Sequence, residues 1–231
     1  MTDALSYVNE NLAAIRENIA EAADKCGRRA EEIRIMAVTK TVAPETVNRA
    51  VELGVTLLGE NRVQEFLSKQ EAYDSSAEIH FIGHLQTNKV KYIIEPMTMI
   101  QSVDSIKLAQ EINRLASAHN KVMDILCEVN IGGEESKSGI APDSLAELIE
   151  AAASMENLRV RGLMTIPPPA SGDIFLGRME ELFHKVRNSA GLSMDVLSMG
   201  MTHDYADAVK HGSTLVRIGT GLFGARDYSK K

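Results

Sequence analysis

Short apolar runs alternate with segments of helical spacing along almost the whole chain. The first segment, 3–25, has apolar residues every three or four positions, which predicts an amphipathic helix. Eight apolar runs then predict strands at 33–40, 55–59, 78–82, 97–101, 122–129, 158–164, 196–198 and 213–218. The segments between them predict helices at 45–53, 62–72, 86–94, 104–119, 142–154, 173–188 and 203–210. Asp104 is the expected N-cap of the helix at 104–119.

This alternation of strands and helices indicates an α/β protein with parallel strands and right-handed crossovers. Eight such units in 231 residues favour a single closed (β/α)8 TIM barrel with an extra N-terminal helix. An open, doubly wound sheet is the alternative. No linker rich in Pro, Gly or Ser divides the chain, and the Pro167–Pro169 run is too short to be a boundary. We therefore expect one domain over residues 1–231.

The amino-acid composition limits the kinds of binding partner and the cellular compartment that are expected for this protein. The chain has 32 acidic against 25 basic residues, a net charge of −7, and only 4% aromatic residues, which disfavours a nucleic-acid partner. Cys26 and Cys127 are isolated and have no metal-ligand spacing, as in a reducing cytosol. We find no secretory signal and no apolar run approaching the ~18 residues of a membrane span. The sequence predicts a cytoplasmic protein without a metal or a membrane contact.

Polar residues follow each predicted strand. They are Lys40, Glu60 with Asn61, His84, Ser102, Asn130, Thr165, Ser198, and Arg217 with Thr220. Active sites of barrels lie at the carboxyl ends of the strands, so these side chains are expected at one mouth.

Lys40 is open to two interpretations. It ends a mostly apolar run, so it is either a lysine that extends from a strand end into solvent or a lysine that forms a Schiff base. A pocket that partly desolvates a lysine favours its neutral amine, which attacks aldehydes. Position alone does not separate the two.

The two C-terminal loops give the strongest local signal. Residues 198–202 and 217–221 each supply a glycine, a hydroxyl group and free backbone N–H groups near a helix start. Such groups bind phosphate, and the loops after strands seven and eight are the usual phosphate site of barrels. Two ordinary glycine turns are the alternative. The three spaced glycines of 219–224 do not predict a dinucleotide site, because no strand and acidic residue follow them.

Other polar residues at the strand ends have simpler interpretations. Asn61 is either a helix N-cap or a side chain that faces the mouth. His84 is more typical of a surface position than of an acid–base group. Ser198 has no nucleophile elbow and no visible triad. We expect His203 and Asp204 to face solvent.

Several motifs together resemble the pyridoxal-phosphate homeostasis proteins, a family that binds pyridoxal 5′-phosphate (PLP). They are residues 37–40 (AVTK), 59–61 (GEN), 80–86 (HFIGHLQ) and 162–164 (GLM), with the two C-terminal loops. The resemblance runs from about Leu5 to Tyr228. It implies a fold-type III barrel, similar to the N-terminal domain of alanine racemase.

The resemblance also implies the cofactor site. It implies that PLP forms an aldimine on Lys40, that Arg217 faces the pyridine nitrogen and that Asn61 lies near the ring. By the same resemblance the phosphate would be held by Ser198, Gly200, Thr202, Gly219 and Thr220. Position 202 is Thr where Ser is frequent in the family, and the hydroxyl group is kept.

Three interpretations of the function follow from these expectations. The first is a non-catalytic protein that stores, buffers or delivers PLP to apoenzymes and so influences amino-acid and keto-acid balance. A cation at Arg217 disfavours a protonated ring, which is the better electron sink. The expected absence of a second β-domain favours the same function, with a monomer as the expected state. The alternative is a small PLP enzyme similar to a racemase. A third interpretation is a sugar-phosphate enzyme that uses Lys40 without PLP.

Overall fold

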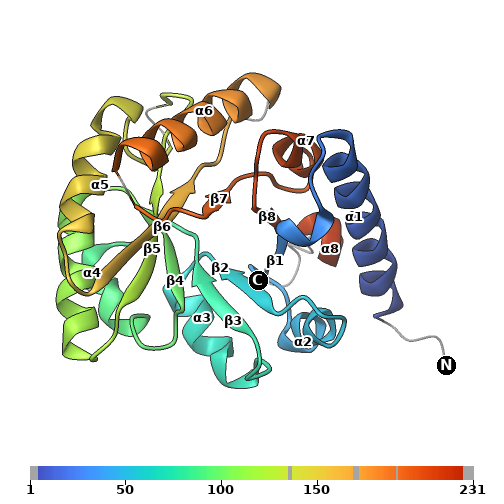
Figure 1. Ribbon diagram of the computed structural model, residues 1–231. Coiled ribbons are helices and arrows are strands. Elements are labelled where there is room, and N and C mark those ends of the chain that lie inside the picture. Colours follow the sequence, from blue (N-terminus) through green and yellow to red (C-terminus); the bar gives the residue numbers. More distant parts are fainter. Residues whose placement is uncertain (1–4, 135–136, 169–171, 191, 226–231) are drawn as a thin grey trace.

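Each short apolar run forms a strand, and each strand pairs in parallel with the next one along the chain (Figure 1). The computed structural model describes residues 5–134, 137–168, 172–190 and 192–225. Its strands are β1 (Arg34–Val38), β2 (Leu57–Glu60), β3 (Glu78–Phe81), β4 (Met99–Val103), β5 (Met123–Glu128), β6 (Leu158–Met164), β7 (Val196–Ser198) and β8 (Leu215–Ile218). Because β8 also pairs with β1, the sheet closes into a barrel.

Helices connect the strands and surround the barrel (Figure 1). The α-helices are α1 (Ser6–Lys25), α2 (Pro44–Glu52), α3 (Val63–Lys69), α4 (Ile106–Ala118), α5 (Leu145–Ala153), α6 (Gly172–Ala190), α7 (Tyr205–Lys210) and α8 (Thr220–Phe223). Short 3₁₀ helices lie at η1 (Ala30–Glu32), η2 (Gln70–Ala72), η3 (Thr87–Tyr92) and η4 (Pro142–Ser144).

Side chains of the strands alternate between the barrel interior and the layer under the helices. The outer layer is one large apolar cluster that joins most strands to their helices. Inside the barrel, two smaller apolar groups pack together. They are Met36, Leu57, Ile82 and Leu215, and Met99, Leu126 and Met164. Because these inner groups are small, the interior also has room for polar residues.

The extra N-terminal helix packs beside the end of the chain. Helix α1 lies next to α7 and α8 in Figure 1, packs against both, and buries Val8, Leu12, Ile15 and Ile19. The Asn11 side chain donates to the Leu222 carbonyl at 3.0 Å. The predicted first helix therefore packs against the helices that follow β7 and β8.

The closed barrel confirms the predicted fold class, and the doubly wound alternative is wrong. Three details differ. The segment expected as a helix at 86–94 is the 3₁₀ helix η3, and α8 was not predicted. The N-cap of α4 is Ser105, whose hydroxyl accepts from the Leu108 N–H, whereas the Asp104 carboxylate lies 3.8 Å from His84.

Parts of two expectations fall outside the described residues. Pro169 of the proline run and Tyr228, where the resemblance ends, both lie there. That residues 1–231 form one domain stays a prediction.

Candidate functional site

Lys40 follows β1 at the carboxyl-terminal mouth of the barrel. Met36 and Val38 of this strand belong to the inner apolar group, and alternation puts the Cβ of Lys40 on the same side. The side chain is half-buried, and its amine makes no hydrogen bond or ion pair with any residue that the structure describes. Lys40 therefore presents a free amine at the mouth.

Two glutamates fix the backbone on either side of this lysine. Thr39 donates its hydroxyl to Glu60 at 2.6 Å, and the Thr41 N–H donates to Glu65 at 2.6 Å. Thr41 has a left-handed φ of 63°, which is uncommon for a non-glycine residue. The backbone of Lys40 is thus held in place while its amine stays unpaired.

Glu60 faces the helices and not the mouth. It accepts hydrogen bonds from Thr39 and from the Tyr73 hydroxyl, both at 2.6 Å, on one oxygen. Burial raises the pKa of this carboxyl, and the two hydrogen bonds oppose that effect. Glu60 was predicted at a strand end, and its contacts give it a structural role behind the loop that carries Lys40.

Arg217 places a buried positive charge at the inner end of the mouth. Its guanidinium donates to the Ser198 hydroxyl and to the Thr165 carbonyl, both at 2.7 Å. Burial lowers the pKa of Arg217 to about 10, and the facing Glu128 carboxylate opposes this effect. The side chain therefore stays charged at neutral pH.

Two buried oxygens at the carboxyl ends of β2 and β5 have no hydrogen-bond partner in the described part of the chain. They are Asn61 Oδ1 and Glu128 Oε2. The backbone of Asn61 is held close by Gly83, where an added Cβ would lie 2.1 Å from the Asn61 carbonyl oxygen. Asn61 makes no N-cap hydrogen bond, since the α3 cap position is Arg62. Its free oxygen is available to a bound molecule.

The loops after β7 and β8 contact each other through hydroxyl groups. The Thr202 hydroxyl accepts from the Gly221 N–H at 3.1 Å and lies 3.4 Å from the Thr220 hydroxyl. Thr220 begins α8, so its N–H has no partner inside that helix. Gly200 has φ 92° and lies against Ala208, where an added Cβ would come within 2.6 Å. Hydroxyl and N–H donors therefore gather here.

Gly219 differs from Gly200, because the fold does not require a glycine there. Its φ is −107°, and an added Cβ would meet only Val38 atoms, at 3.6 Å or more. The chain therefore leaves room next to Thr220 that a side chain could fill. Open space beside hydroxyl and N–H donors can accommodate an anionic group.

Ser198 and Asp204 are placed differently from what we expected. The Ser198 hydroxyl accepts from Arg217 and donates to Gln101, so its one hydrogen is already used in a hydrogen bond inside the barrel. Asp204 is half-buried and accepts from the Met201 N–H at 2.6 Å, which corrects the expectation that it faces solvent. His203 is exposed, as expected.

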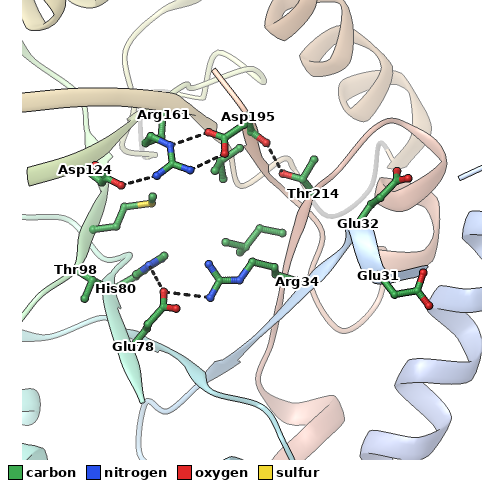
Figure 2. Close-up of a pocket in the computed structure, with 13 residues that line it drawn as sticks. Glu31, Glu32, Arg34, Glu78, His80, Thr98, Asp124, Arg161, Asp195 and Thr214 are labelled. Atoms are coloured by element: carbon green, nitrogen blue, oxygen red, sulfur yellow. Dashed lines mark hydrogen bonds and ion pairs between the residues drawn. The ribbon is translucent and has the colours of Figure 1, made fainter. Parts of the chain in front are cut away.

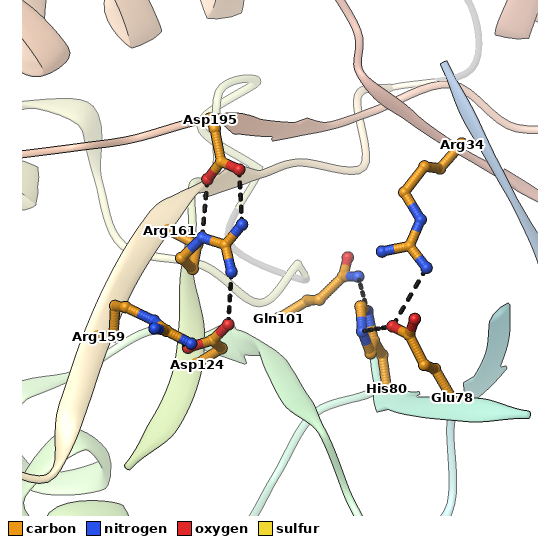
Figure 3. A network of polar contacts seen from close by, with 8 residues as sticks. All are labelled: Arg34, Glu78, His80, Gln101, Asp124, Arg159, Arg161 and Asp195. Atoms are coloured by element: carbon orange, nitrogen blue, oxygen red, sulfur yellow. Dashed lines mark hydrogen bonds and ion pairs between the residues drawn. The ribbon is translucent and has the colours of Figure 1, made fainter. Parts of the chain in front are cut away.

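A chain of hydrogen bonds below Arg217 was missed by the sequence analysis. Ser198 donates to Gln101 Oε1 at 2.7 Å, and Gln101 Nε2 lies 2.8 Å from His80 Nδ1. Figure 3 shows this lower part, with His80 between Gln101 and Glu78. The sequence feature that could have indicated this chain is the occurrence of single polar residues within otherwise apolar strands.

The structure brings the main predicted residues together. Lys40, Asn61 and Arg217 lie at the ends of β1, β2 and β8, and the hydroxyl loops follow β7 and β8. These four strands are consecutive around the barrel. His84, Asn130 and Thr165 follow β3, β5 and β6, and Ser102 lies within β4.

Comparisons with known proteins agree with this geometry. The family model "Alanine racemase, N-terminal domain" matches residues 11–227. Proteins named "Pyridoxal phosphate homeostasis protein" are 43% identical in Aquifex aeolicus (95% of this chain, 98% of the relative) and 40% identical in Escherichia coli (98% and 100%). This chain belongs to the pyridoxal phosphate homeostasis protein family.

A solved relative has the same fold. PipY of Synechococcus elongatus, solved with PLP bound, superposes with a TM-score of 0.82 at 28% identity, covering 94% of this chain and all of that one. Among the residues described here, no helix is long and apolar enough to cross a membrane, and no cluster of His, Cys, Asp and Glu could hold a metal ion.

Glu128 gives a pH-dependent prediction for this site. Burial, together with the Asp104 charge, raises its pKa from 4.5 to about 7, and Arg217 opposes the shift. The folded protein then holds a proton that the unfolded chain releases near pH 4.5. The stability from this group is complete below pH 4.5 and is lost as the pH rises through 7.

Glu128→Gln keeps a neutral side chain at every pH. Its free energy of unfolding should therefore rise relative to the wild type by about 2–3 kcal/mol between pH 4.5 and about pH 8, measured by urea denaturation. Glu17→Gln, on the exposed face of α1, is the matched control. A difference between Glu128→Gln and wild type that does not change with pH contradicts the assignment.

Proposed function

We propose that this chain binds PLP at the mouth of the barrel and holds it for supply to other proteins, without catalysing turnover. Lys40 would bond the aldehyde carbon, and Arg217 would face the ring nitrogen with Asn61 near the ring. Gly200, Thr202, Gly219 and Thr220 would hold the phosphate. The family membership and the PLP-bound relative PipY support this assignment.

The main support for PLP binding is that the candidate residues lie at the ends of four consecutive strands. A pair of hydroxyl loops, a buried cation, a free amine and the unpaired Asn61 amide oxygen lie at the ends of β7, β8, β1 and β2. PLP has a matching aldehyde, ring nitrogen and phosphate group. Ser198 would act on the cofactor indirectly, through Arg217. Its hydroxyl accepts from Arg217 and already donates its hydrogen to Gln101.

Arg217 favours storage over catalysis. PLP supplies an aldehyde that captures amines and a ring that stabilises carbanions best when its nitrogen is protonated. The guanidinium of Arg217 is charged and has only donors, so it disfavours a proton on a facing nitrogen. The chain's own groups thus favour capture of the aldehyde over stabilisation of a carbanion.

We propose that the protein acts in the cytoplasm as a monomer and passes PLP to apoenzymes. The two cysteines support a reducing compartment, since they are unpaired, with Cys127 buried and Cys26 exposed. The half-buried position of Lys40 supports exchange, because the amine stays within reach of solvent.

Loading the purified protein with PLP tests the attachment. We expect an absorbance band near about 420 nm, and borohydride reduction should fix the mass of PLP on Lys40. Lys40→Ala should lose both signals, whereas Lys107→Ala, an exposed lysine of α4, should keep them. A protein that stays colourless after loading would refute PLP binding and favour the sugar-phosphate alternative.

Gly219→Ala tests the phosphate end of the site. The fold accommodates the added Cβ, so the melting temperature should stay within about 2 °C of wild type. The Cβ enters the space left for the phosphate, so PLP should dissociate at least tenfold faster in a transfer assay to an apoenzyme. Gly177→Ala on α6 is the control. Unchanged PLP release in Gly219→Ala would remove this glycine from the site.

The absence of turnover distinguishes this function from an amino-acid racemase. The PLP-loaded protein should convert L-alanine to D-alanine no faster than free PLP does, in a chiral chromatography assay. Racemisation well above free PLP that Lys40→Ala abolishes would show that the protein is an enzyme.

A further inference from the structure

A cavity of about 340 Å³ lies at the base of the barrel, opposite the mouth (Figure 2). Arg34 and Glu78 enter it from the first residues of β1 and β3, and Asp124 enters from the start of β5. Its volume lies within the ~300–1,000 Å³ range of small-molecule sites. The base therefore has space for a ligand of its own.

One wall of this cavity is closed by a salt-bridge network. Arg161 donates to Asp124 at 2.6 Å and to both oxygens of Asp195 at 2.7 and 2.5 Å, and Arg159 donates to Asp124 at 2.6 Å (Figure 3). Three of the five N–H groups of Arg161 are engaged in these contacts. This wall is therefore held mainly by its own ion pairs.

The opposite wall has donors with spare capacity. The Arg34 side chain is half-exposed, and Glu78, at 3.1 Å, is its one ion-pair partner among the described residues. The His80 side chain is only 3% exposed, and its Nε2 makes no hydrogen bond within the described chain. The nearest charged atom, Glu78 Oε2, is 3.8 Å away, which is too far for a hydrogen bond.

The hydrogen-bond chain from the mouth determines which nitrogen of His80 carries the proton. Arg217 only donates, so Ser198 accepts from it and donates to Gln101 Oε1. Gln101 then donates through Nε2 to His80 Nδ1. Burial, with Arg34 and Arg161 nearby, lowers the pKa of His80 to about 3, so the ring is neutral. Its one proton is on Nε2, facing the cavity.

The charges around the cavity restrict what can accept from His80. The lining has five carboxylates and two guanidinium groups: Glu31, Glu32, Glu78, Asp124 and Asp195 against Arg34 and Arg161. A simple anion would meet an excess of negative charge, and a simple cation would leave the His80 N–H without an acceptor. Leaving a buried donor without an acceptor is unfavourable, because the donor has lost its hydrogen bond to water. A molecule with both charges satisfies both conditions.

We propose that the basal cavity binds a small zwitterion of the α-amino-acid type. Its carboxylate would accept from His80 Nε2–H and Arg34, and its ammonium group would face Glu31 and Glu78. Glu31 is exposed and has no partner in the described residues, so its carboxylate is available. The site is separate from the mouth and does not depend on PLP binding there.

N,N-Dimethylglycine is a suitable probe, because its tertiary amine cannot condense with an aldehyde at the mouth. Protein-observed NMR should show a saturable shift of the His80 Nε2–H signal. Propionate and dimethylammonium, which each carry one charge, should bind at least tenfold more weakly. Lys40→Ala should bind the probe as wild type does.

Arg34→Met should weaken binding of the probe at least tenfold, and the fold should persist because this side chain is half-exposed. Arg187→Met, an exposed arginine of α6, removes the same charge elsewhere and should have no effect. If wild type shows no saturable His80 shift, or if Arg34→Met binds as tightly as wild type, the cavity is only a salt-bridged closure of the barrel.

Discussion

The buried charge of Arg217 constrains the polar interior of this barrel. A guanidinium group taken out of water must have acceptors for its donors, and Ser198 and Thr165 supply them. Because arginine has no acceptor, the direction of each following hydrogen bond is fixed. The Ser198 hydroxyl must then donate its hydrogen bond to Gln101, and Gln101 must donate to His80. One cation at the mouth thereby sets the protonated nitrogen of a histidine near the base.

The alternation of side chains along a strand explains why charged residues face the barrel axis at both ends of the barrel. Arg34 and Lys40 are six residues apart in the sequence. Because side chains of a strand alternate between its two faces, both residues lie on the face toward the barrel axis. Between them, Met36 and Val38 pack in a small inner apolar group. The larger apolar cluster lies between strands and helices and supplies most of the buried apolar area. The fold can therefore tolerate polar groups along its axis.

The sequence predicted the strands well, because their apolar runs are separated by helical spacing, and it predicted Lys40 and Arg217 by the strand-end rule. The 3₁₀ form of 87–92 and the Ser105 cap depend on local hydrogen bonds that periodicity does not contain. His80 and Gln101 were missed for another reason. Both faces of a barrel strand are buried, so a sequence does not tell which polar residue points inward.

The mouth combines a fixed backbone with a free amine. Thr39 and Thr41 are anchored by Glu60 and Glu65, yet neither glutamate contacts the amine of Lys40. An amine that was already ion-paired would have to break that contact before it could bond an aldehyde, and would regain it on release. Without such a partner, no ion pair of the lysine has to break on capture or form again on release. This arrangement suits reversible holding of a carbonyl compound, because the chain adds no ion-pair barrier at the amine.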